Sequence, residues 1–169
     1  MSRSMAGVFP QTTRAEAPRP VYTNEERARR DATRWTLVQG VLAPVQFVVF
    51  LVSLGLIVRT LITGEGWAAA SLSVVIKTLV LYLIMITGAI WEKVVFGRYL
   101  FAPSFFWEDA VSMVVILLHT AYLVAWFGGD ALLDLRTQML LALAAYATYV
   151  INAAQFLYKL RRARLERAP

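Results

Sequence analysis

Residues 91–109 read WEKVVFGRYLFAPSFFWED, and this segment joins two long apolar stretches of the chain. It contains three carboxylates, Glu92, Glu108 and Asp109, and a tryptophan lies next to the acidic residues at each end. The remaining positions are mainly aromatic or small. This composition predicts a segment that performs chemistry or binds a flat ligand at a membrane surface.

The composition of the whole chain is that of an integral membrane protein. Hydrophobic residues make up 59% and charged residues 17%, against roughly 45–50% and about 25% in soluble domains. The apolar residues form blocks, and the charges lie between the blocks and at the two ends. The absence of cysteine excludes disulfides, thiolate nucleophiles and Cys-ligated metals, and a single histidine excludes a multi-His site within one chain.

We expect an all-α integral membrane protein built as a four-transmembrane-helix bundle. The apolar blocks predict spans at about 35–62, 67–91, 105–127 and 135–160 within a membrane domain of residues 35–160. Residues 1–21 are predicted to be a disordered tail, 22–34 a cytoplasmic surface helix and 161–169 a basic tail. Thr23 and Glu26 fit a capping box at the start of the surface helix, and Pro44 predicts a kink in the first span.

Two further patterns support these spans and predict their orientation. Each tryptophan falls at a predicted span end, where indole prefers the head-group zone: Trp35, Trp67, Trp91, Trp107 and Trp126. Lys and Arg gather in both tails and in the segment 91–109, whereas the other two loops contribute only Arg136, with Arg59 nearby. The positive-inside rule therefore places both termini and this segment in the cytoplasm. The net charge of +6 is explained by lipid head groups, and no base-reading motif suggests nucleic acid.

The three carboxylates are candidates for one catalytic site. Glu92 ends the second span and Glu108–Asp109 begin the third, and short connections favour antiparallel neighbours, so the three groups are expected to converge. Carboxyls in unequal environments can divide the roles of acid and base. The alternatives are structural: Asp109 would stabilise the dipole of its helix, and Glu92 would pair with Lys93 or Arg98.

Two ionisable residues lie deeper in the predicted spans. His119 follows Glu108 by eleven residues, which places both on one helix face about 16 Å apart. It is a candidate proton donor, base or axial ligand to a metal in a tetrapyrrole, or else a packing residue. Lys77 either binds a substrate carboxylate or extends to the membrane surface.

Polar residues on the first and last spans are candidates for contact with a ligand. Gln39 and Gln46 lie seven residues apart on one face, on either side of Pro44. Asn152 shares an inward face with Thr148 and Gln155. Hydrogen bonds between helices are the alternative explanation for these amides.

Three segments resemble the 3-vinyl bacteriochlorophyllide hydratases, small membrane enzymes of bacteriochlorophyll synthesis in anoxygenic phototrophs. They are WTLVQGVLAPVQF (35–47), TGAIWEKVVFGRYLFAP (87–103) and FWED (106–109). The resemblance extends over about residues 22–166. It implies that water adds across the C3 vinyl group of a chlorophyllide-type ring to give a 1-hydroxyethyl group. It implies no cofactor and no protein metal, and it suggests membrane lipid and other enzymes of the same synthesis as partners.

The resemblance assigns no catalytic residue, so the roles follow from the chemistry of the reaction. Glu92 or Glu108 would protonate the terminal vinyl carbon, and Asp109 or the other glutamate would orient the attacking water. The substrate-binding candidates are His119 as a ligand to the substrate magnesium, Arg98 or Lys77 for the ring propionate, Gln39 and Asn152, and the aromatic residues Tyr99, Phe105, Phe106 and Trp107.

Two other functions fit some of these features. A non-enzymatic protein that holds tetrapyrroles for assembly of a pigment complex would use the same aromatic segment and the same histidine. A small channel or transporter fits less well, because the sequence has no internal repeat and no continuous polar stripe.

Overall fold

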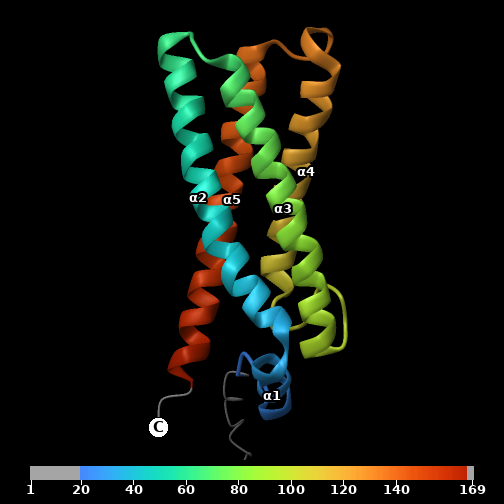
Figure 1. Cartoon of the computed structure of the whole chain (residues 1–169). Helices are drawn as coiled ribbons and strands as arrows, with labels where there is room; N and C mark the ends of the chain where they lie inside the picture. The colour runs from blue at the N-terminus through green and yellow to red at the C-terminus, as the bar shows by residue number, and fades with distance from the viewer. Residues whose placement is uncertain (1–19, 167–169) are drawn as a thin grey trace, which may run out of the picture.

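The computed structural model describes residues 20–166, and this part of the chain is helical apart from turns and loops. The helices are α1 (Asn24–Ala32), α2 (Arg34–Thr63), α3 (Trp67–Phe96), α4 (Phe106–Gly128) and α5 (Leu135–Leu165), with a 3₁₀ turn, η1 (Gly129–Ala131), before α5. Figure 1 shows α2 to α5 as four long, roughly parallel rods with α1 folded across one end.

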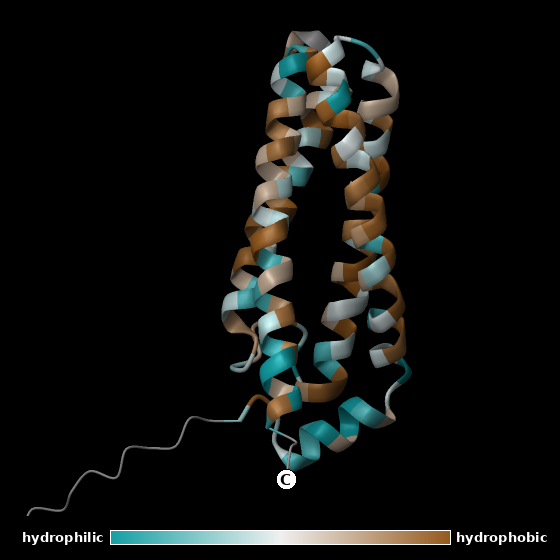
Figure 2. Cartoon of the chain, turned by 90° about the vertical axis from the view of Figure 1, so that its left-hand side faces the viewer, coloured by the Kyte–Doolittle hydropathy of each residue, from teal (hydrophilic) through white to brown (hydrophobic). Residues whose placement is uncertain are grey.

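The four long helices are each long and apolar enough to cross a membrane. Figure 2 shows their middle portions as mainly hydrophobic, whereas α1 and the helix ends are hydrophilic. The all-helical, multi-pass architecture predicted from the apolar blocks is therefore confirmed. Many leucines and valines on α2 to α5 are exposed, as lipid-facing side chains are.

The ends of the helices follow local sequence signals. Thr23 and Glu26 form the predicted capping box: Thr23 Oγ1 accepts from the Glu26 N–H at 3.2 Å, and Glu26 Oε2 accepts from the Thr23 N–H at 2.8 Å. Gly64 and Gly97 end α2 and α3 with φ of 74° and 82°, which glycine adopts without a Cβ penalty. Helix α2 continues through Pro44, so the kink there remains a prediction.

Two helices extend beyond the sequence-based spans, and the predicted tail ends earlier than expected. Helix α3 continues five residues beyond Trp91 to Phe96, and α5 continues beyond residue 160 to Leu165, because neither segment meets a glycine or proline sooner. Residues 1–19 of the predicted tail lie outside the described residues. Val21, at the end of that predicted tail, is buried, and its N–H donates to Glu166 Oε2 at 3.0 Å.

The long helices pack as two antiparallel hairpins, α2 with α3 and α4 with α5. The core between them is apolar: Ile57, Val74, Val115, Tyr122, Met139 and Tyr146. Polar links cross it, as when Tyr146 Oη donates to Ser53 Oγ at 2.7 Å and so joins α5 to α2. At the end where α1 lies, the α3–α4 connector (residues 97–105) and the end of α5 come together. The α2–α3 turn and η1 lie at the opposite end (Figure 1).

Candidate active site

Glu92, Glu108 and Asp109 converge at the end of the bundle that carries α1. Glu92 lies in the last turn of α3, and Glu108 and Asp109 lie in the first turn of α4. Their exposed fractions are 5%, 6% and 3%, so all three carboxyl groups have been removed from solvent. Buried carboxyls are costly unless they are hydrogen-bonded or paired. Glu92 and Asp109 interact with each other, whereas Glu108 is paired with a lysine.

The carboxyl groups of Glu92 and Asp109 lie side by side at this end of the bundle, close enough to interact as a pair. Two ionised carboxylates this close repel each other and have no donor between them, so one proton shared by the pair stabilises it. Backbone amides of the connector supply the other donors: the Phe101 N–H donates to Asp109 Oδ2 at 2.7 Å, and the Ala102 N–H donates to Glu92 Oε2 at 3.4 Å. The connector therefore shapes the pair directly.

Phe101 reaches its donor position through an unusual backbone conformation. Its φ is 59°, and among residues 20–166 no other residue except glycine has a positive φ. A bulky residue in this region costs about 1–2 kcal/mol. Such strain is typical of positions that the surrounding structure holds for a purpose, here to direct two consecutive N–H groups at Asp109 and Glu92.

Comparing two substitutions at Phe101 measures this strain. We expect Phe101→Gly to be more stable than Phe101→Ala by about 1 kcal/mol, because glycine relieves the positive φ but has a more flexible unfolded chain. Both variants lose the same ring, so the difference between their stabilities reports the cost of the backbone conformation alone. Thermal unfolding followed by circular dichroism in one detergent measures it. Equal stabilities would show that the connector relaxes to a negative φ when the ring is removed.

Glu108 has a cation instead of a second carboxyl. Lys159 Nζ lies 3.1 Å from Glu108 Oε1 and donates to the Ser104 carbonyl at 2.6 Å. Asn152 Nδ2 donates to the Glu108 carbonyl at 2.8 Å, and Ser112 Oγ donates to the same carbonyl at 2.8 Å. Glu108 Oε2 is buried and has no hydrogen-bond partner among the described residues, so one oxygen of this group remains available.

A buried aromatic cluster closes the site on the α1 side. Phe105 packs against Tyr22, Trp91, Phe96 and Phe156 with ring centroids 5.6–6.0 Å apart. Burial raises the pKa of Tyr22 to about 12, and the nearby Arg30 guanidinium opposes this only partly. The Tyr22 phenol therefore stays neutral and serves packing. Phe105 is 2% exposed, so its contact with a macrocycle stays a prediction and would require this cluster to open.

A second aromatic group is exposed beside the carboxyls. Phe106 packs against Phe101 and Trp107 with centroids 5.6 and 5.5 Å apart. Trp107 is 72% exposed, and Tyr99, on the same connector, is also exposed. We call Tyr99, Phe101, Phe106 and Trp107 the aromatic surface. It is continuous with the site, because the Phe101 N–H bonds to Asp109.

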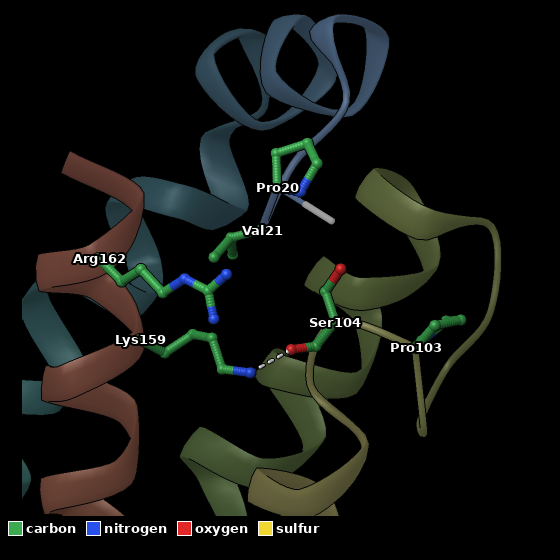
Figure 3. Close-up of a pocket in the computed structure, with 6 residues that line it drawn as sticks. All are labelled: Pro20, Val21, Pro103, Ser104, Lys159 and Arg162. Atoms are coloured by element: carbon green, nitrogen blue, oxygen red, sulfur yellow. Dashed lines mark hydrogen bonds between the residues drawn. The ribbon is translucent and has the colours of Figure 1, made fainter. Parts of the chain in front are cut away.

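A cavity of about 200 Å³ lies beside Lys159 and Ser104 (Figure 3). It is lined by Pro20, Val21, Pro103, Ser104, Lys159 and Arg162. Sites for ligands of drug size have roughly 300–1,000 Å³, so this cavity suits a few waters rather than a large ring. Figure 3 shows Lys159 directed at the Ser104 carbonyl along one wall.

The sequence profile described as 2-vinyl bacteriochlorophyllide hydratase (BCHF) matches residues 22–162. The chain belongs to the 2-vinyl bacteriochlorophyllide hydratase family. It is 67% identical over 157 residues to the hydratase of that name from Cereibacter sphaeroides, covering 92% of this chain and 96% of the relative. It is 64% identical over 160 residues to the one from Rhodobacter capsulatus, covering 95% and 92%. No solved structure matches the chain. Membership of this family makes the chain an enzyme of the hydro-lyase class.

Two of the candidate residues of this hydratase-family chain lie away from the carboxyls. Lys77 and His119 are both 0% exposed, in the interior of the bundle. Lys77 Nζ lies 3.9 Å from the centroid of the Tyr149 ring, and His119 stacks on Tyr146. His119 Nδ1 is hydrogen-bonded to the Val115 carbonyl at 2.8 Å, whereas Nε2 has no partner among the described residues. Magnesium ligation by His119 stays a prediction and would require these helices to separate.

The other predicted contacts divide between structural bonds and exposed positions. Gln39 Nε2 donates to Thr87 Oγ1 at 2.8 Å and joins α2 to α3. The Asn152 amide donates to the Glu108 carbonyl and so joins α5 to α4. Arg98 is exposed on the connector. Lys93 Nζ donates to the Gly97 carbonyl at 2.9 Å, so the alternative in which it neutralises Glu92 is wrong.

Sequence reasoning missed Lys159, Phe101 and Tyr22 as parts of the site. Lys159 lies at the end of the fourth predicted span, seven residues after Asn152 and therefore on the same helix face. That spacing is a signal that could have found it. No sequence signal marks the positive φ of Phe101, because Phe is not a residue that favours it. Among residues 20–166 no cluster of three His, Cys, Asp or Glu side chains is arranged to hold a metal ion.

Proposed function

We propose that this chain adds water to the vinyl group of a chlorophyllide-type tetrapyrrole and forms a 1-hydroxyethyl group. The relatives' names place the vinyl group at position 2, which in the older ring numbering is the carbon now called C3. The observation that carries the proposal is the convergence of three buried carboxyls with unequal partners. Hydration of an alkene needs both a proton donor and a proton acceptor.

The reaction proceeds by protonation of the terminal vinyl carbon, which leaves a cation on the carbon attached to the ring. Delocalisation into the macrocycle stabilises this cation, and water then attacks it. Glu92, Glu108 and Asp109 supply the acid and the base. Their burial keeps bulk water away from the cation and strengthens the electrostatic interactions that stabilise it.

The macrocycle lies on the aromatic surface and not in an internal cavity. Tyr99, Phe106 and Trp107 offer exposed rings next to Asp109, and ring stacking suits a flat conjugated ligand. Arg98 lies on the same connector and is exposed, so it is placed to bind the ring propionate. The substrate thus approaches at the boundary between lipid and water, as an amphiphilic acid would.

The end of the bundle that carries Glu92, Glu108 and Asp109 faces the cytoplasm, and both termini lie on that side of the bacterial inner membrane. The support is the excess of Lys and Arg at that end. The chain has no cysteine, so single introduced cysteines report topology cleanly. Arg98→Cys should react with a membrane-impermeant maleimide only after cells are opened, whereas Glu65→Cys should react in intact spheroplasts. The reverse pattern would overturn the orientation.

The activity is tested by incubating the purified protein in detergent with a 3-vinyl chlorophyllide. A product heavier by one water, with loss of the vinyl signals in its NMR spectrum, is the expected result. A pigment that co-purifies unchanged would instead indicate the non-enzymatic carrier function, which the aromatic surface would also serve. If the protein neither binds nor converts the pigment, both the hydratase function and the carrier function are overturned.

A further inference from the structure

The three carboxyls of the site are not equivalent, and the difference lies in one cation. Glu92 and Asp109 contact each other and two backbone N–H groups. Glu108 contacts Lys159, at 3.1 Å, and directs a second oxygen, Oε2, into the buried site without a partner among the described residues. Among these residues no other basic side chain forms a salt bridge with any of the three carboxyls.

We propose that Lys159 is a positioning residue that assigns the acid and base roles among the three carboxyls. It holds Glu108 as the carboxylate base, and the Glu92–Asp109 pair keeps the proton and acts as the acid. This inference rests on the proposed function, because it assigns roles within the same hydration reaction. Lys159 itself touches neither substrate nor reacting atoms. It acts through the charge and the orientation of Glu108.

The electrostatics of the site support this division. Glu108 is faced by Lys159 from α5, by Glu92 from α3 and by Asp109 from its own helix. A cation within 4 Å favours the charged form of a carboxyl, whereas neighbouring carboxyls disfavour it. A proton on the Glu92–Asp109 pair, which has no cation, relieves this repulsion, and the negative charge resides on Glu108, which has one.

Lys159 is itself held in place, which a positioning role requires. Its ammonium donates to the Ser104 carbonyl at 2.6 Å and lies 5.6 Å from the centroid of the Phe105 ring. Asn152, two turns earlier on α5, bonds the Glu108 backbone. Two contacts from α5 thus fix the first turn of α4, one at the backbone and one at the carboxylate. The cavity beside Lys159 gives water a polar approach to this side of the site.

The division gives a balanced reaction. The pair donates its proton to the terminal vinyl carbon as the π electrons form the new C–H bond. Water forms the C–O bond at the ring-attached carbon and gives a proton to Glu108 Oε2. Transfer of that proton from Glu108 to the neighbouring pair restores the starting state, and one water has been added with no other reactant consumed.

Infrared spectroscopy tests the division without any substrate, so failure of the proposed function does not affect the result. The wild type should show a protonated-carboxyl C=O band that changes frequency or disappears in Asp109→Asn and in Glu92→Gln but stays unchanged in Glu108→Gln. Lys159→Met should gain a second such band, which Glu108→Gln removes in the double variant. Loss of the wild-type band in Glu108→Gln would overturn the assignment, and this arm does not depend on whether Lys159→Met folds.

Kinetics provide the second test. Lys159→Met should lower kcat by about tenfold to a hundredfold with little change in KM, because the base is impaired while the aromatic surface is intact. Lys159→Arg keeps the charge and should remain within about threefold of the wild type. Arg161→Met is the matched control, because Arg161 is an exposed basic residue two positions after Lys159 on α5. Equal losses in Lys159→Met and Lys159→Arg, or a rise in KM alone, would overturn the positioning role.

Discussion

Glu92→Gln is expected to lower kcat for vinyl hydration by about 10²–10⁴-fold, the range that a positioned acid or base contributes. Gln keeps the shape of Glu and can still accept the N–H of Ala102, which lies 3.4 Å from Glu92 Oε2. It cannot share an acidic proton with Asp109. The variant therefore removes proton-transfer capacity with little change in packing, and Asp109→Asn is expected to act in the same way.

Initial rates measured as formation of the hydroxyethyl pigment check this expectation. Glu65→Gln is the matched control, because Glu65 is an exposed carboxyl in the α2–α3 turn at the opposite end of the bundle. It should keep wild-type activity. Full activity in both Glu92→Gln and Asp109→Asn would refute the acid role of the pair, and thermal unfolding of each variant separates lost chemistry from lost fold.

The convergence of these carboxyls could be predicted from the sequence, whereas their partners could not. A short connector forces α3 and α4 to be neighbours, so Glu92 must lie near Glu108 and Asp109. The pairing of Glu92 with Asp109 depends on how α3 packs on α4, and the ion pair of Glu108 with Lys159 depends on how α5 packs on α4. Lys159 is 51 residues from Glu108 in sequence, and helical periodicity fixes the direction of a side chain but not what it meets.

The same limit applies deeper in the bundle. The spacing of Glu108 and His119 correctly predicts that both lie on one face of α4, and both are buried there. A polar face of this kind could line an open slot. In the structure α5 fills the space beside His119, where the Tyr146 ring stacks at a centroid distance of 5.7 Å. Whether a face lines a cavity or a packed interface depends on the volume of residues on another helix.

Lys77 is the residue for which the structure decides between alternatives that the sequence left open. A lysine near the middle of a span can extend to the surface or remain inside. Its side chain is fully buried, so it does not reach the surface. Within residues 20–166 its amine has no hydrogen-bond acceptor, and the Tyr149 ring at 3.9 Å is the aromatic contact it makes. An unsatisfied buried donor costs about 1–3 kcal/mol, and more when charged.

Lys77→Met is therefore expected to stabilise the protein by about 1 kcal/mol. Met has nearly the same length, leaves no donor unpaired and regains a sulfur–aromatic contact of about 0.3–1.5 kcal/mol with Tyr149. The variant gives up a cation–π contact of about 2 kcal/mol, which is smaller than the penalty for a charged amine with no acceptor. The midpoint of thermal unfolding in one detergent should rise, whereas Lys93→Met, at an exposed amine, should change it little.

The kinetics of Lys77→Met separate a structural cost from a functional purpose. If Arg98 binds the propionate on the aromatic surface, KM for the pigment should not change in Lys77→Met and should rise in Arg98→Met. A fall in stability together with a raised KM would show that Lys77 holds an anion in the assembled site. The bundle would then have to open to admit the ring, and the buried position of Lys77 and His119 would describe a closed state of the enzyme.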